Sequence, residues 1–415
     1  MNFISKRPII VIGALFFIFG FVTWLNGALI PFFKIVCNLS NFESLLVAFC
    51  FYISYFIMAL PSAWILQKTG FKNGMVLGLV IMAIGMLVFL PAAISRNYAV
   101  FLTGLFVIGT GLAVLQTAAN PYVTVLGNVE SAAQRISIMG VCSKAAGVAS
   151  PILLGSIVFA NANELMSTLP TLSFEQKEVL LNELSSKIIA PYAFMASTLA
   201  FLAFVVWKID LPQIDLDQHT NDQEKSLNSK ASIFQSPNLI LGVVALFLYV
   251  GAEVIAGDTI INYAMTQGIG IDQASKFTSI TLIAMLLGYF LGIFAIPKYM
   301  KQETFLLISA ILGILFVLAT LVFKGYVSVF CVAALGLANA IMWPAIWPLA
   351  IKDLGKFTKL GSSMLIMAIA GGALLPLAYG QIADSYSPQI GYSILLVCYG
   401  FILYYAIFGH KKLKW

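Results

Sequence analysis

The stretch 239–258, LILGVVALFLYVGAEVIAGD, is apolar for fourteen residues before it reaches two acids, Glu253 and Asp258. Twenty helical residues at a rise of about 1.5 Å each cross about 30 Å, the thickness of the hydrocarbon core of a bilayer. The stretch therefore predicts a membrane-spanning helix. A charge at the bilayer centre costs about 2.5 to 3.5 kcal/mol or more, so the two acids indicate a face turned toward protein or water.

Eleven further apolar blocks of similar length occupy the rest of the chain. The 415 residues are 60% hydrophobic and 10% charged, too few charges to cover a soluble protein of this size. The blocks are too long for the alternating strands of a membrane barrel, and the basic residues form no continuous patch for nucleic acid. We therefore predict an all-α polytopic membrane protein. Its twelve transmembrane helices begin near Pro8, Ser44, Met75, Tyr98, Ile136, Pro191, Leu239, Phe277, Phe305, Tyr326, Ser362 and Gly391.

Two wide gaps, 161–190 and 208–236, separate these blocks, and the second is polar and lies between spans six and seven. It predicts an amino-terminal six-helix bundle at 1–209, a cytoplasmic linker at 210–236 and a carboxy-terminal six-helix bundle at 237–415. A repeat supports two related halves. Gly147, Pro151 and Gly155 recur with the same spacing as Gly372, Pro376 and Gly380. A binding site is expected near the midplane, where the halves face each other.

The distribution of basic residues predicts the orientation of the chain. With the amino terminus inside, sixteen of the 23 Lys and Arg residues fall on the inner side and six on the outer side. This bias predicts a multi-pass protein of the bacterial inner membrane with both termini in the cytoplasm. Lys6 and Arg7 precede the first apolar block without a cleavage site, so that block is expected to stay as a span. The five cysteines lack metal-ligand spacing, and no metal or cofactor is expected.

Three charged residues lie inside predicted spans: Glu253, Asp258 and the one remaining base, Lys144. At 1.5 Å per residue, Lys144 lies about 18 Å from the inner edge, Glu253 about 21 Å and Asp258 about 28 Å. We expect Lys144 to pair with Glu253 more readily than with Asp258. The other acid, with Asp258 as the candidate, is then left to bind a proton, bind a cation or stay hydrated, so either Asp258 or Glu253 could be the coupling acid. In the alternative, the pair only holds the halves together, and Asp258 bonds to Asn262 one turn on.

Neutral polar residues at membrane depth indicate the ligand. Amides that bond to hydroxyl groups, beside aromatic rings that stack on a pyranose, suit a neutral sugar better than an anion or an apolar compound. The alternative to sugar stacking, for each tryptophan, is a role in packing or in the belt of aromatic residues at the membrane interface. Trp343 and Trp347 lie one turn apart beside Pro344 and Pro348, which favours a cavity role. The predicted sugar-binding residues are Asn26, Gln116, Asn120, Asn262, Asn339, Trp24, Trp343 and Trp347.

The sequence resembles the fucose–proton symporter family of the major facilitator superfamily, especially its glucose/galactose and N-acetylglucosamine transporter branch. Its most specific matches are LQTAANPYVT at 115–124, YVGAE at 249–253 and the segment from Leu354-Gly355 to Gly361-Ser362-Ser363. The superfamily signature between spans two and three is faintly present as QKTGFK at 67–72. The resemblance implies sugar uptake driven by a cation gradient through a rocking movement of the two bundles.

Two positions depart from the fucose symporters, which carry an Asp where this chain has Gly27 and a Glu where it has Gln116. Gln116 occurs in the glucose-type branch, whereas Gly27 leaves the first span without a carboxylate. Lys144, Glu253 and Asp258 are therefore predicted to provide the ion coupling instead.

These observations together predict an importer of a neutral, glucose-like hexose that co-transports H⁺. The alternatives are an N-acetylglucosamine or fucose symporter, a carrier coupled to Na⁺, and an uncoupled facilitator. A membrane enzyme would need a nucleophile or metal cluster at depth, and a receptor would need a large soluble domain. The sequence shows neither feature, so we expect a carrier rather than an enzyme or a receptor. We expect a monomer in the bilayer.

Overall fold

The computed structural model describes residues 8–125, 132–158, 172–209, 233–296, 299–352, 354 and 357–412. Within these ranges the structure contains helices and no strand, and 12 helical spans are long and apolar enough to cross a membrane. The predicted all-α fold with twelve transmembrane helices is confirmed. Residues 210–232, most of the predicted linker, lie outside the described ranges, so the predicted domain boundaries stay predictions.

In the described residues, the amino-terminal half contains six spans and one four-residue helix outside them, and its sixth span, Phe174–Lys208, is divided between two helices. One left-handed residue, Gly70 (φ +75°), separates spans two and three within α5, at the signature-like segment 67–72. Its helices are α2 (Pro8–Thr23), α3 (Asn26–Val36), α4 (Asn41–Ser44), α5 (Leu46–Ser95), α6 (Tyr98–Val125), α7 (Ala132–Val158), α9 (Phe174–Ser186) and α10 (Ile189–Lys208).

The carboxy-terminal half begins with the short η3 (Ile233–Gln235) and contains the other six spans. Among the described residues, each of these spans except the one at 302–322 is divided between successive helices or continues directly into a second helix. The helices are α12 (Pro237–Asp258), α13 (Ile260–Thr266), α14 (Ile271–Ala274), α15 (Phe277–Ala295), α16 (Gln302–Val322), α17 (Gly325–Asn339), α18 (Met342–Ile351), α19 (Thr358–Met367), η5 (Ala368–Ala370), α20 (Gly371–Ser385), α21 (Pro388–Gly391), α22 (Ile394–Ile407) and η6 (Gly409–Lys411).

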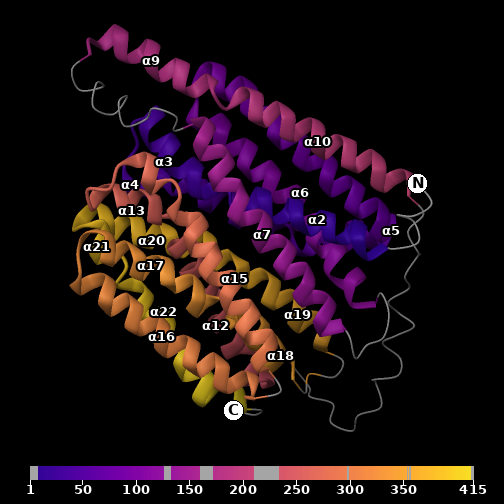
Figure 1. Ribbon diagram of the computed structural model, residues 1–415. Helices are drawn as coiled ribbons and strands as arrows, with labels where there is room; N and C mark the ends of the chain where they lie inside the picture. The colour runs from indigo at the N-terminus through magenta and orange to yellow at the C-terminus, as the bar shows by residue number, and fades with distance from the viewer. Residues whose placement is uncertain are drawn as a thin grey trace.

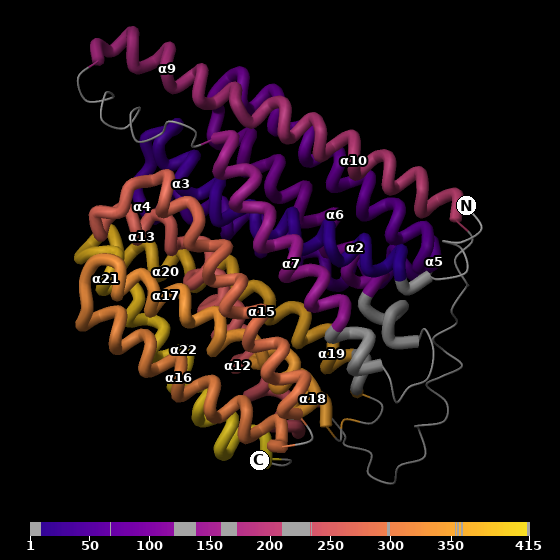
Figure 2. The backbone as a smooth tube through the Cα atoms, in the orientation of Figure 1, coloured from indigo at the N-terminus to yellow at the C-terminus, as the bar shows by residue number. Residues whose placement is uncertain are grey.

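The two halves lie side by side, the first drawn from indigo to magenta and the second from orange to yellow (Figures 1 and 2). Across the interface α7 packs on α15, and α5 packs on α20. Gly147 and Gly372, which occupy matching positions in the repeat, face this interface: Gly147 lies against Leu282 of α15, and Gly372 lies against Tyr52 of α5. We call the end where α10 stops and α12 starts the linker end, and the opposite end the α9 end.

The first span of each half is interrupted by a break between two helices. Between α2 and α3 the chain turns at Trp24 and Leu25, where bonds of the i→i+3 type replace helical ones, such as Ala28 N to Leu25 O at 3.0 Å. Between α12 and α13 the break falls at Thr259, whose hydroxyl donates to Ile255 O at 2.6 Å. Hydroxyl groups that compete for helix carbonyls in this way often accompany bends. Each half therefore has irregular backbone in its first span.

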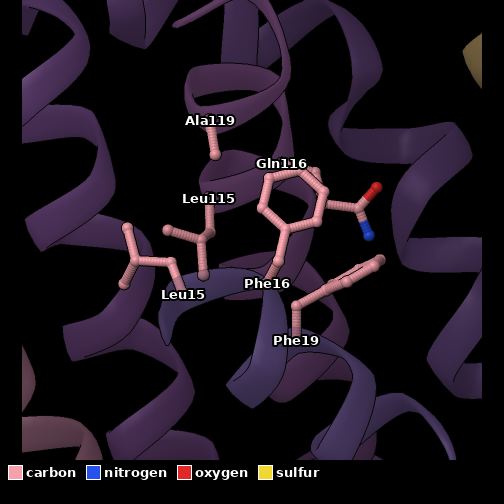
Figure 3. Close-up of a pocket in the computed structure, with 6 residues that line it drawn as sticks. All are labelled: Leu15, Phe16, Phe19, Leu115, Gln116 and Ala119. Atoms are coloured by element: carbon pink, nitrogen blue, oxygen red, sulfur yellow. The ribbon is translucent and has the colours of Figure 1, made fainter. Parts of the chain in front are cut away.

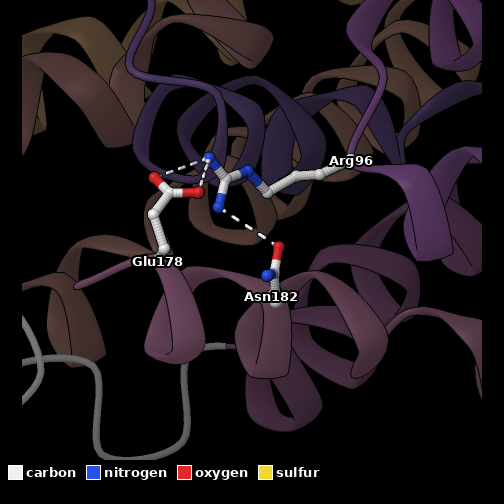
Figure 4. Close-up of polar contacts among 3 residues, drawn as sticks. All are labelled: Arg96, Glu178 and Asn182. Carbon is white, nitrogen blue, oxygen red and sulfur yellow. Dashed lines mark hydrogen bonds and ion pairs between the residues drawn. The ribbon is translucent and has the colours of Figure 1, made fainter. Parts of the chain in front are cut away.

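A helix that the sequence did not predict lies in the gap 161–190. Helix α9 starts with a capping box, in which Ser173 and Gln176 each bond to the other's backbone N–H. Arg96, a left-handed residue (φ +48°) that ends α5, fixes α9 to the bundle. Its guanidinium pairs with Glu178 at 3.0 Å and donates to Asn182 Oδ1 at 3.2 Å (Figure 4). The acids at 175, 178 and 183 are helical residues rather than loop residues.

Candidate functional site

A largely buried ion pair joins the two halves. Lys144 Nζ on α7 lies 2.6 Å from Glu253 Oε1 on α12, and each side chain is 13% exposed. The phenols of Tyr249 and Tyr289 lie within electrostatic range of Glu253. The predicted pairing of Lys144 with Glu253 is therefore found, whereas the predicted coupling role stays a prediction.

Trp24 occupies the space beside this ion pair. Lys144 Nζ lies 4.7 Å from the centre of its ring, a distance suited to a cation–π contact. A methyl group built at Gly147 would lie 2.5 Å from Trp24 Cδ1, and one at Gly257 would collide with the other part of the ring. Two glycines, one from each half, thus hold the tryptophan at the break in the first span. The indole is 4% exposed and packs against protein, and its predicted contact with a sugar stays a prediction.

Asp258 is the last residue of α12 and is fully buried. Neither of its carboxylate oxygens has a hydrogen-bond partner among the residues that the structure describes. The alternative in which Asp258 bonds to Asn262 is therefore wrong. A buried carboxylate without a partner is unfavourable as a bare charge, so this group must take up a proton or acquire another partner. Glu253 and Tyr52 lie within its electrostatic range.

Asn26 directly follows the break in the first span and is 1% exposed. Its Nδ2 also has no partner among the described residues. Its neighbour Gly27 faces Thr278, whose hydroxyl donates to Gly257 O at 2.7 Å. Gly27 and Gly257 thus both contact Thr278. Asn26 precedes the first of these glycines and Asp258 follows the second, so the two side chains with groups unpartnered among the described residues lie beside the same contact. Polar groups with unmet hydrogen bonds next to broken helices are typical of midplane binding sites in transporters.

Gln116 on α6 donates to the hydroxyl of Tyr55 at 2.8 Å and lines a hollow in the amino-terminal half. Figure 3 shows its amide beside the rings of Phe16 and Phe19. The hollow has room for about one water molecule, so a sugar requires it to widen. The amide and the aromatic rings are of the kinds that bind hydroxyls and stack on a pyranose.

Trp343 and Trp347 lie one turn apart on α18 and stack on each other, with ring centres 5.5 Å apart. Trp343 also lies 6.5 Å from the ring of Tyr249, near Glu253. Both tryptophans are half-buried, and the adjacent prolines at 344 and 348 are exposed. The pair therefore forms an aromatic surface that runs from the level of the ion pair toward the linker end.

The remaining predicted amides do not gather at one place. Asn339 is buried in the carboxy-terminal half, where its Oδ1 accepts from Tyr399 at 2.9 Å. Asn262 lies beyond the break in span seven and lines a second hollow with Asn41, Thr259 and Tyr379. The side chain of Asn120 lies outside the described part of the chain. Their predicted sugar contacts stay predictions.

Two tyrosines of α5 that the sequence analysis did not name lie between these groups. The hydroxyl of Tyr55 accepts a hydrogen bond from Gln116, and Tyr52 stacks on Tyr55 with ring centres 6.4 Å apart. Tyr52 is also close enough to Asp258 to interact with it electrostatically. Their spacing of three residues, which places both on one helix face, was the available signal. The signal is weak, because the chain contains 16 tyrosines.

Comparison with known proteins agrees with this architecture. The model of the Major Facilitator Superfamily matches residues 11–362. A glucose/galactose transporter of Brucella abortus is 32% identical over 96% of this chain and 93% of its own length. The L-fucose-proton symporter of Escherichia coli is 28% identical over 91% of this chain and 87% of its own length.

A crystal structure of the Escherichia coli fucose:proton symporter superposes with a TM-score of 0.71 and 26% identity, covering 97% of this chain and 98% of that one. The resemblance to the fucose–proton symporter family and its glucose/galactose branch is confirmed. The chain spans a membrane several times and belongs to the major facilitator superfamily.

Proposed function

We propose that this protein is a cation-coupled symporter that co-transports a proton with a neutral, glucose-like hexose. The observation that carries the proposal is the imbalance of charge inside the membrane. Lys144 is paired with Glu253 between the halves, while Asp258 is buried without a partner. An unpaired carboxylate in such a place is a natural acceptor for a transported proton.

The proposed cycle uses the ion pair as a link and Asp258 as the coupling acid. Alternating access requires α7 and α12, which carry Lys144 and Glu253, to change their relative position. Protonation of Asp258 removes its charge and so changes the relative free energies of the two arrangements. A ligand shifts such an equilibrium only by its difference in affinity for the two states.

A sugar substrate is supported by two independent lines. The relatives described above carry the names glucose/galactose transporter and L-fucose-proton symporter. In this chain, the amide of Gln116 lies beside Phe16 and Phe19, and Trp343 and Trp347 form a half-buried stacked pair. Amides and flat aromatic faces are the groups that bind a neutral pyranose.

The proposed location is the bacterial inner membrane, with the linker end in the cytoplasm. The sixteen-to-six bias of basic residues supports this orientation, because positive charge accumulates on the cytoplasmic side.

The coupling proposal is tested in proteoliposomes with Asp258→Asn. Asp258→Asn should abolish glucose accumulation driven by an imposed pH gradient, while gradient-free exchange of labelled glucose continues. Asn keeps the size of the side chain but cannot carry the proton. Glu178→Gln, an exposed acid within one half, is the matched control and should accumulate glucose like the wild type.

Accumulation at the wild-type level in Asp258→Asn would refute the assignment of the coupling acid. Replacing the pH gradient with a sodium gradient identifies the ion. Running the exchange assay with galactose, fucose and N-acetylglucosamine identifies the sugar, because hexoses differ by single hydroxyl contacts. Wild-type protein that exchanges glucose but accumulates it under neither gradient would be an uncoupled facilitator.

A further inference from the structure

The α9 end contains a second direct connection between the halves. Asp384, near the end of α20, accepts hydrogen bonds from residues at the start of α4 in the other half. Its Oδ1 lies 3.0 Å from Asn41 N and 2.7 Å from Asn41 Nδ2, and its Oδ2 lies 2.8 Å from Phe42 N. One carboxylate thus receives three hydrogen bonds across the interface.

The surroundings of Asp384 bring the two segments into close contact. A methyl group built at Gly380, one turn earlier on α20, would lie 2.8 Å from Leu45 Cδ1 and 3.0 Å from Phe42 Cα. Asn41 is fixed on its other side as well, because Lys34 Nζ donates to its Oδ1 at 2.6 Å. The amide of Asn41 therefore connects a cation of the first half to an anion of the second.

This connection lies next to a hollow between the halves. Asn41 lines the hollow with Ser44 and Leu45 of the first half and with Thr259, Asn262 and Tyr379 of the second. Moving α4 away from α20 would break the three bonds to Asp384 and widen this hollow. A connection that must break for the hollow to open acts as a gate.

We propose that Asp384 is a gating residue whose hydrogen bonds to Asn41 and Phe42 hold the α9 end closed. The contacts lie at the exposed surface, where hydrogen bonds and ion pairs contribute modestly, so thermal motion can break and re-form them. Asp384 serves transport through the position of α4 and is a positioning residue. The inference depends on the alternating movement in the proposed function, but not on the identity of sugar or ion.

The test measures the separation of the halves without sugar or ion gradient. Spin labels are placed on the exposed residues Ala99 and Lys324 through Ala99→Cys and Lys324→Cys, after the five native cysteines are replaced. Electron spin resonance then gives the distribution of distances across the α9 end. Asp384→Ala should raise the ratio of open to closed molecules about tenfold, since three bonds to a charged acceptor are lost.

Asp384→Asn keeps one carbonyl acceptor and should give an intermediate shift, and it replaces the alanine variant if that variant fails to fold. Glu178→Gln removes an ion pair at the same end within one half and should leave the distribution unchanged. An unchanged distribution in both Asp384 variants, or an equal shift in Glu178→Gln, would overturn the gate. Failure of the proposed coupling appears in the accumulation assay instead, and leaves these distances as predicted.

Discussion

Two ion pairs of this protein each join a basic side chain to a glutamate, but they differ in burial and in whether they connect the two halves. Lys144 and Glu253 lie 2.6 Å apart, are 13% exposed and come from different halves. Arg96 and Glu178 lie 3.0 Å apart, are 20% and 39% exposed and both belong to the amino-terminal half. The first pair must change if the halves move, whereas the second moves as one body with its bundle.

The contrast shows that location determines what an ion pair does. An exposed pair contributes about 0 to 1 kcal/mol, and here it holds α9 against the end of α5. A buried pair is costly to desolvate, so its net stabilisation is small while the loss of one partner is expensive. The buried pair is thus suited to giving two arrangements of the halves different free energies. The exposed pair is suited to holding one helix in place.

The largest expected effect comes from breaking the buried pair on one side. Lys144→Met leaves Glu253 buried without its partner and should lower the free energy of unfolding by about 3 to 5 kcal/mol. Lys144→Met combined with Glu253→Gln should recover most of that loss, since no charge is then left unpaired. Chemical unfolding in detergent measures both. A single variant that costs no more than Glu178→Gln would remove the energetic distinction between the two pairs.

A smaller effect is expected from filling the space around Trp24, which covers one side of the buried pair. Gly147→Ala places a methyl group against the indole, and such overpacking should cost about 1 to 3 kcal/mol. Gly400→Ala in α22 is the control, because open space surrounds that position and alanine is the better helix former by up to about 1 kcal/mol. Thermal unfolding of both variants sharpens the comparison. Equal melting temperatures would show that the space beside Trp24 can expand freely.

The smallest effect is expected from the exposed pair. Glu178→Gln should change the free energy of unfolding by less than about 1 kcal/mol and leave glucose exchange at the wild-type rate. High salt should reduce even this difference, because exposed charges are screened. A large loss of exchange in this variant would mean that α9 takes part in the movement of the halves.

Most of the transmembrane architecture could be predicted from the sequence, because apolar blocks of about twenty residues have one stable arrangement in a bilayer. The pairing of Lys144 with Glu253 also followed from depth, since a fixed rise per residue converts sequence position into height in the membrane. Rare charges in an apolar background are conspicuous, and few partners were available.

What the sequence analysis missed depends on contacts between distant segments outside the apolar core. Asp384 looked like one more loop acid, because its value comes from Asn41 and Phe42, about 340 residues away. Helix α9 was read as part of a gap, since its mixed composition resembles a loop until Arg96 anchors it. Tyr52 and Tyr55 were hidden among many aromatic residues in apolar spans.

The breaks at Trp24–Leu25 and at Thr259 restrict how the bundles can turn. Backbone groups released from helical bonding cannot face hydrocarbon without a large loss of free energy, so both sites must remain covered by protein or water. Neither first span can therefore rotate its broken side outward to the lipid. Any new arrangement of the two halves must therefore keep both breaks away from lipid.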